Sequence, residues 1–302
     1  MLALASRRAG RARLALGLGR LDPRASLGAA AALAALGVLV ALAAAQPVWR
    51  TDETTSTRAD AAAWVVIDTS RSMLAAEAPG GEDRLARARR VALRVRAELA
   101  DVPVGLASLS DRALPHLFPS PDEEAFARAL ARAIRAGHPQ PTGLGESGTD
   151  LTALASLPTA NFFSPATARR AAIVLTDGET APVQPNVLDA AFRAVPQTAL
   201  LLVHVGRRGE RVYDASGLAE PGYDPAVDGA AAVRGVAALT AGSAFEESDA
   251  AAVAAAARRA VGASGPTAEL VRGERRTPLS PWVLAASVVP LAYLVRRRNV
   301  DR

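Results

Sequence analysis

The sequence predicts an α/β fold, with a doubly wound and mostly parallel sheet between two transmembrane helices. Three observations lead to this prediction. Short apolar runs end abruptly in polar residues, as buried strands do at the carboxyl edge of a parallel sheet. Amphipathic stretches with helical spacing separate these runs. Long uncharged apolar segments lie near both ends of the 302-residue chain.

The N-terminal apolar segment predicts a membrane span over residues 27–45. It follows a basic stretch, 1–26, that contains only one acid, Asp22. Nineteen residues in a helix extend about 28 Å, close to the hydrocarbon thickness of roughly 30 Å. A cleaved signal peptide ending near Ala45 is the alternative, although the apolar region of a signal peptide is usually shorter.

The C-terminal apolar segment predicts a second span over residues 279–295. It is short for a span and contains Pro290, so a buried or amphipathic tail helix is the alternative. Arginines 296–298 follow it directly. Basic residues outside both spans place the two tails, 1–26 and 296–302, in the cytoplasm. The region between the spans is then expected outside the inner or plasma membrane.

Strand and helix patterns alternate between the spans, within a predicted domain over 62–262 that is flanked by linkers at 46–61 and 263–278. The predicted strands are 64–67, 102–109, 113–118, 171–176, 198–206 and 242–246. The predicted helices are 83–99, 121–135, 150–160, 188–195, 233–240 and 250–261. The arginines of 83–99 are expected on a solvated face. Residues 137–148 are predicted to form a loop, and 207–230 are assigned no regular structure.

The strand at 64–67 leads directly into an acid and two spaced hydroxyl groups, Asp68, Ser70 and Ser72. Carboxylate and hydroxyl oxygens are hard ligands, which suit Mg²⁺, Mn²⁺ or Ca²⁺ better than zinc. The alternative is that Asp68 and Ser70 only cap the following helix. Two later features favour a shared site: Thr149 in a glycine-rich loop, and Asp177 at the end of a second apolar strand.

These motifs, D-x-S-x-S, then G-T-D, then a strand ending in T-D-G, resemble the metal-ion-dependent adhesion site of the von Willebrand factor A (VWA) domain. The resemblance implies one divalent cation with ligands from Asp68, Ser70, Ser72, Thr149 and Asp177, and an open position for a partner's carboxylate. The family usually has glycine where this chain has Arg71. The added charge beside the ion is expected to change partner preference.

The chain is also similar to bacterial Bat-type (aerotolerance-related) VWA membrane proteins, whose span is followed by a proline turn like Gln46-Pro47. The resemblance implies a partner protein that offers an acidic residue to the metal, and a role in protein–protein interaction or assembly at the cell envelope. It also suggests an association with other VWA membrane proteins and a MoxR-like ATPase system.

Two other functions fit parts of the sequence. One is Mg²⁺-dependent phosphoryl or ester hydrolysis with Asp68 as nucleophile, which lacks support because the chain has no lysine and no phosphate-binding loop. The other is a metal-free VWA scaffold.

Nucleic-acid binding is not expected, despite the net charge of +5, because few aromatic residues accompany the arginines. The chain has no cysteine, which excludes thiolate chemistry and disulfides. The leading prediction is therefore a metal-dependent binding protein and not an enzyme.

Overall fold

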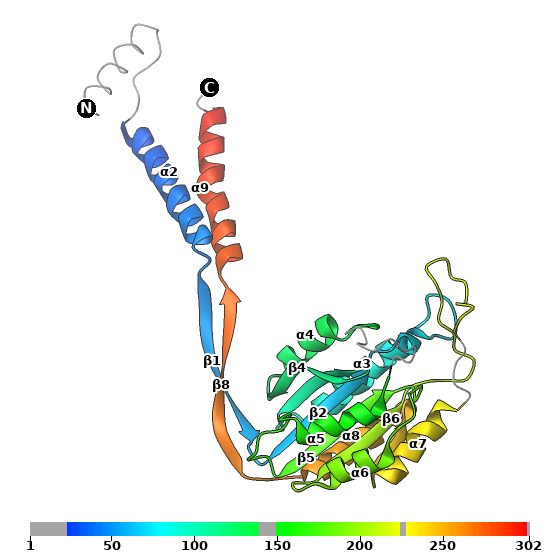
Figure 1. The fold of residues 1–302 in the computed structure, drawn as a ribbon. Helices are drawn as coiled ribbons and strands as arrows, with labels where there is room; N and C mark the ends of the chain where they lie inside the picture. The colour runs from blue at the N-terminus through cyan, green and yellow to red at the C-terminus, as the bar shows by residue number, and fades with distance from the viewer. Residues whose placement is uncertain (1–22, 139–148, 224–227, 301–302) are drawn as a thin grey trace. The chain divides into compact units, whose positions relative to one another are not determined.

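The computed structural model describes residues 23–138, 149–223 and 228–300. Most of the predicted loop 137–148, most of the basic N-terminal stretch, residues 224–227 and the last two residues lie outside this range. The chain forms two compact units, one of Met1–Glu53 with Arg272–Arg302 and the other of Thr54–Val271 (Figure 1).

The smaller unit contains two helices, α2 (Pro23–Ala44) and α9 (Ser280–Val300), which pack together. Their contact is close: a Cβ added to Gly28 would lie 2.6 Å from the Tyr293 hydroxyl. Among the described helices, only α2 is long and apolar enough to cross a membrane, over Leu27–Ala44, a criterion that rests on length and composition. Helix α9 contains Pro290, as expected, and its role as a second span stays a prediction.

The predicted linkers are not simple connectors. Strand β1 (Val48–Arg58) pairs with strand β8 (Thr267–Pro278) in a separate two-stranded sheet. Both unit boundaries fall within these two strands. The sequence of β1, V-W-R-T-D-E-T-T-S-T-R, is rich in β-branched threonine, which favours extended structure. This sequence lacks the alternation of apolar and polar residues that is typical of a half-buried strand, which is why it predicts a linker and not a strand.

The larger unit is built on a sheet of six strands in the order β4-β3-β2-β5-β6-β7. All neighbouring pairs are parallel except β3 and β4, which form an antiparallel hairpin. The predicted doubly wound, mostly parallel sheet is therefore confirmed. The strands are β2 (Ala61–Asp68), β3 (Val104–Leu109), β4 (Ala113–Ser120), β5 (Arg169–Thr176), β6 (Thr198–His204) and β7 (Ser243–Glu246).

Helices cover both faces of this sheet (Figure 1). Because successive strand residues point to opposite faces, Val65 and Ile67 of β2 join one core while Trp64 and Val66 join the other. The first core is completed by helices α3 (Arg84–Glu98), α4 (Glu123–Ala133) and α8 (Ala250–Val261). The second is completed by α5 (Ser156–Thr159), α6 (Pro185–Arg193) and α7 (Gly229–Leu239).

Trp64 is the largest fully buried side chain. Its indole nitrogen donates to the Phe162 carbonyl at 3.0 Å, and its ring makes edge contacts with Phe118 and Phe162. This satisfies the one polar atom of a buried indole. This packing holds the middle of β2, and Asp68 lies at the carboxyl end of the same strand.

Two helix predictions need correction. Residues 150–160 form a 3₁₀ turn, η2 (Leu151–Ala155), followed by the short α5, and not one helix. Pro158 has no N–H to bond the Leu154 carbonyl, which disfavours one regular helix through this short stretch. Helix α7 begins at Gly229, four residues before the predicted start, because the Asp228 side chain accepts from the Ala231 amide and caps it.

The chain leaves β2 for β3 on one side and later builds β5 on the other side. The carboxyl ends of β2 and β5 therefore flank the point where the winding direction reverses, which is where open α/β sheets bind ligands. Asp68 ends β2 and Asp177 follows β5. The register, with Ile67 opposite Leu175, places these two ends side by side.

Candidate metal centre

Asp68 is fully buried at the end of β2, and neutral donors satisfy its carboxylate. The Ser70 amide and the Thr149 hydroxyl donate to Oδ1 at 2.8 and 2.9 Å. The Thr176 hydroxyl donates to Oδ2 at 2.7 Å. Burial raises the pKa of Asp68 above its usual value, and these hydrogen bonds oppose the rise.

Ser70 and Ser72 lie on the turn that follows, at the start of the 3₁₀ segment η1 (Arg71–Leu74). Both serines are buried, and their hydroxyl oxygens are 2.9 Å apart. The alternative prediction is that Asp68 and Ser70 only cap the following helix. The Ser70 side chain makes no capping hydrogen bond to η1. The turn therefore presents two neighbouring hydroxyl groups next to Asp68.

Thr149 is also buried, and its backbone is tied to the loop after β5. The Ala181 amide donates to the Thr149 carbonyl at 2.8 Å, and the Thr180 hydroxyl donates to it at 3.3 Å. Because the Thr149 hydroxyl simultaneously reaches Asp68, this residue links the loops that follow β2 and β5.

Asp177 is almost completely buried, and a charged donor holds it. The Glu179 amide donates to Oδ1 at 3.0 Å, and the Arg84 guanidinium donates to Oδ2 at 2.8 Å. Burial raises the pKa of Asp177 to about 7, and the negative charges of Asp68 and Glu179 add to the rise. Arg84 and a hydrogen bond from Ser72 oppose it.

The glycine of the T-D-G motif has a steric role. Gly178 has a φ of +79°, and a Cβ added to it would lie 2.3 Å from the Gly229 carbonyl oxygen. Gly229 in turn packs against the Asp177 carbonyl, which a Cβ there would meet at 2.0 Å. Glycine at both positions lets the start of α7 close over the loop that carries Asp177.

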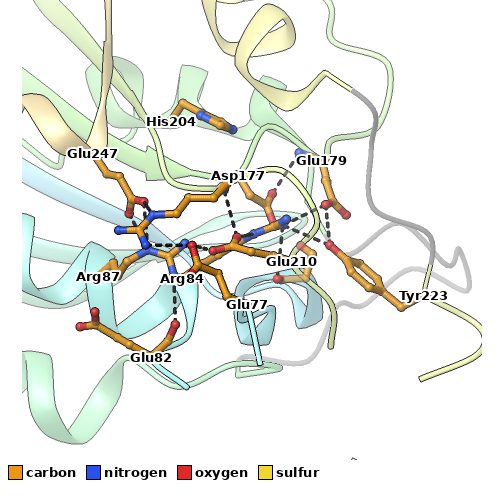
Figure 2. Close-up of polar contacts among 12 residues, drawn as sticks. Glu77, Glu82, Arg84, Arg87, Asp177, Glu179, His204, Glu210, Tyr223 and Glu247 are labelled. Atoms are coloured by element: carbon orange, nitrogen blue, oxygen red, sulfur yellow. Dashed lines mark hydrogen bonds and ion pairs between the residues drawn. The ribbon is translucent and has the colours of Figure 1, made fainter. Parts of the chain in front are cut away.

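Arg84 and Arg87, at the start of α3, lie at the centre of a buried ion network (Figure 2). Arg84 contacts Asp177, Glu179 and Glu210 at 2.8 to 2.9 Å. Arg87 contacts Glu210 at 2.5 Å and Glu247 at 2.8 Å. The prediction of a solvated arginine face on this helix is therefore wrong for Arg84 and Arg87. Their burial is possible because each guanidinium has carboxylate partners.

Segment 207–223 supplies part of this network through a buried acid, Glu210, which the local sequence does not indicate. Glu210 is fully buried between the two arginines. The Tyr223 hydroxyl donates to Glu179 at 2.6 Å (Figure 2). Glu220 pairs with Arg71 at the surface, at 2.7 Å. The segment has no regular structure, as predicted, and no periodicity marks Glu210 for burial.

The structure thus brings together the five predicted site residues, which are Asp68, Ser70, Ser72, Thr149 and Asp177. Their role as ion ligands stays a prediction. In the described part of the chain, no group of three or more His, Cys, Asp or Glu side chains could hold a metal. An ion here would therefore need the hydroxyl groups. Hydroxyl and carboxylate oxygens are the donors that hard divalent cations prefer, so these residues fit such an ion.

Several solved structures are similar to this chain. No protein-family model matches the chain, and no curated protein matches it. Similar solved structures include BatB from Bacteroides thetaiotaomicron, 21% identical over 65% of this chain and 96% of that chain, with a TM-score of 0.49. An aerotolerance-related membrane protein from Bacteroides fragilis is 19% identical over 67% and 98%, also with a TM-score of 0.49.

A third similar structure is the von Willebrand factor type A protein from Catenulispora acidiphila. It is 16% identical over 71% of this chain and 49% of that chain, with a TM-score of 0.42. The chemistry of the site follows from the residues that this chain itself places there.

Proposed function

We propose that this protein is a membrane-anchored binding module that holds a divalent cation and uses it to bind another protein. The observation that carries the proposal is the meeting of the Ser70 and Ser72 hydroxyls with Asp68, Thr149 and Asp177 at the switch point of the sheet. Residues far apart in the sequence converge there, and each is buried.

The charges around the site favour a cation. The buried carboxylates of Asp68, Asp177 and Glu210, with the partly buried Glu179, outnumber the neighbouring guanidinium groups of Arg84 and Arg87. Buried charge without a partner is costly, so a bound cation would relieve the surplus. An ion held partly by neutral hydroxyls keeps positive character, which would attract a partner's Asp or Glu.

The same geometry disfavours a hydrolase. Both Asp68 oxygens accept hydrogen bonds, and the side chain has no exposed surface, so Asp68 is poorly placed to attack a phosphoester or an ester. Membrane anchoring of the binding module agrees with an N-terminal helix that is apolar enough to cross a membrane. We infer two spans, an outward-facing domain, and partners among envelope proteins, including other VWA membrane proteins and a MoxR-like ATPase system.

The ion is tested on the full chain in detergent after EDTA treatment. Trp49 and Trp282 are replaced by phenylalanine so that the buried Trp64 alone reports unfolding. Mg²⁺, Mn²⁺ or Ca²⁺ at a hundredfold excess over its dissociation constant should stabilise the fold by about 2.7 kcal/mol. Ser70→Ala/Ser72→Ala should remove most of this gain. Ser110→Ala is the matched control, because Ser110 is buried but bonds Asp111 instead of the site. Stabilisation that survives the double substitution would contradict the site.

The partner is tested by purifying the tagged full chain from detergent-solubilised membranes, with Mg²⁺ or with EDTA. The proposal expects a co-purifying protein that EDTA releases and that Asp68→Asn fails to retain. Asparagine keeps the shape of the side chain but removes its charge. Partners retained equally by all samples would indicate a metal-free scaffold.

A further inference from the structure

Arg84 occupies an unusual place for a positive charge, in direct contact with a predicted ion ligand. Its Nη1 lies 2.8 Å from Asp177 Oδ2, and both side chains are nearly inaccessible to solvent. The same Nη1 lies 3.5 Å from the Ser72 carbonyl, on the turn that carries the hydroxyl groups. A guanidinium therefore lies where the positive charge of a bound ion would act.

The remaining contacts of Arg84 hold it in position without Asp177. Its Nε donates to Glu210 at 2.8 Å, and its Nη1 also contacts Glu179 at 2.9 Å and the Tyr223 hydroxyl at 3.1 Å. The guanidinium thus has other acceptors if it moves away from Asp177. Such a shift would not leave a buried arginine without a partner.

Arg87 provides an internal comparison. It lies one turn further along α3, is equally buried, and shares Glu210 with Arg84. Its other described partners are Glu247 and the Glu82 carbonyl. The two arginines therefore differ in that Arg84 contacts Asp177 and its neighbour Glu179, and Arg87 contacts neither in the described structure.

We propose that Arg84 competes with the divalent cation for Asp177 and so sets the ion affinity of the site. This inference rests on the proposed ion-binding function. Two cations near one buried carboxylate repel each other, and the low local dielectric strengthens the repulsion. Removing Arg84 therefore tightens ion binding, because the repulsion outweighs the loss of one hydrogen bond that orients Asp177.

The test compares two double variants of the full chain in detergent, Arg84→Gln/Glu210→Gln and Arg87→Gln/Glu210→Gln. Each loses one arginine and the glutamate that both arginines share, and only the first also frees Asp177 and Glu179 from a guanidinium. The probe is Mn²⁺, whose free concentration is followed by electron paramagnetic resonance at about pH 8.5. We expect the Arg84 variant to bind Mn²⁺ at least about tenfold more tightly than the Arg87 variant. Affinities within about twofold of each other would overturn the inference.

A conservative variant separates charge from structure. Arg84→Lys keeps the positive charge, so its Mn²⁺ affinity should stay within about threefold of the unchanged chain. A tenfold tightening in Arg84→Lys would show that the charge of Arg84 is not the cause. If the glutamine variants unfold, Arg84→Met/Glu210→Met and Arg87→Met/Glu210→Met make the same comparison, since apolar side chains often replace buried ion pairs without loss of stability.

The outcomes also separate the two proposals. Mn²⁺ binding that is equal in both double variants contradicts the role of Arg84 and leaves the ion site intact. No Mn²⁺ binding in any of these proteins contradicts both. Binding that becomes measurable only when Arg84 is removed supports both.

Discussion

The loops after β2 and β5 each place a buried aspartate at the same edge of the sheet, but they stabilise it differently. Asp68 accepts from neutral donors: the Ser70 amide and the hydroxyls of Thr149 and Thr176. Asp177 accepts from the Glu179 amide and the Ser72 hydroxyl, and in addition from the charged guanidinium of Arg84. The first carboxylate belongs to a local hydrogen-bond network, and the second belongs to an ion network.

This difference separates an anchor from an adjustable group. The donors to Asp68 come from its own turn, from the neighbouring strand and from Thr149, whose backbone is fixed by the loop after β5. The environment of Asp177 depends on α3 and, through Glu210, on segment 207–223. Changes in remote parts of the chain should therefore affect Asp177 more than Asp68.

The largest expected effect is on the ion network. Glu210→Ala leaves Arg84 and Arg87 short of a buried carboxylate, and breaking such a pair typically costs 3 to 5 kcal/mol. Urea unfolding of the full chain in detergent, followed by Trp64 fluorescence, should show a loss of about this size. Glu77→Ala is the control, since Glu77 pairs with Arg207 at the surface. A loss below about 1 kcal/mol in Glu210→Ala would mean that the network adds little to stability.

A smaller effect is expected in the hydrogen-bond network. Thr176→Val keeps the shape of the side chain but removes its hydrogen bond to Asp68, and bonds to charged groups contribute about 1.5 to 3 kcal/mol. It also removes the bond that the hydroxyl accepts from the Gly178 amide at 3.1 Å. Thr69→Val is the matched control, because the buried Thr69 hydroxyl donates to the neutral Leu109 carbonyl. It should cost about 1 kcal/mol. Equal losses in the same urea titration would contradict the special strength assigned to the Asp68 contact.

The smallest effect is expected at the surface. Arg71 forms a two-point contact with Glu220, but its side chain is 68% exposed. Exposed pairs typically contribute less than 1 kcal/mol, so Arg71→Ala should leave the urea midpoint nearly unchanged. Its effect should be on the EDTA-sensitive partner instead. A loss of stability comparable to that of Glu210→Ala would show that Arg71 belongs to the buried network.

The parts of the fold that the sequence predicted correctly follow from local pattern. The run from Trp64 to Asp68 and the run from Ala171 to Asp177 each show a buried strand that ends in an acid. Parallel strands place those ends at one edge, so the juxtaposition of Asp68 and Asp177 follows from the fold class. Helix α8 has the predicted bounds because its apolar spacing is regular.

The ion network could not be predicted in the same way. Arg84 and Glu210 are 126 residues apart, and nothing in either local sequence indicates that they pair. A charged residue at the start of an amphipathic helix is ordinarily solvated, and only a tertiary partner makes its burial favourable. Strands β1 and β8 were missed for a related reason, since each depends on pairing with a distant segment.

The two edges of the central sheet have a consequence for molecules concentrated on a membrane surface. Edge strand β4 contains Pro115 and Pro119, which lack the N–H groups that an incoming strand would bond, and edge strand β7 has only four residues. Short edges and prolines are how natural sheets avoid edge-to-edge aggregation. Crowded copies of the protein should therefore resist pairing their edge strands into a continuous sheet. Any association between copies would use loops and side chains instead, and such contacts can remain reversible.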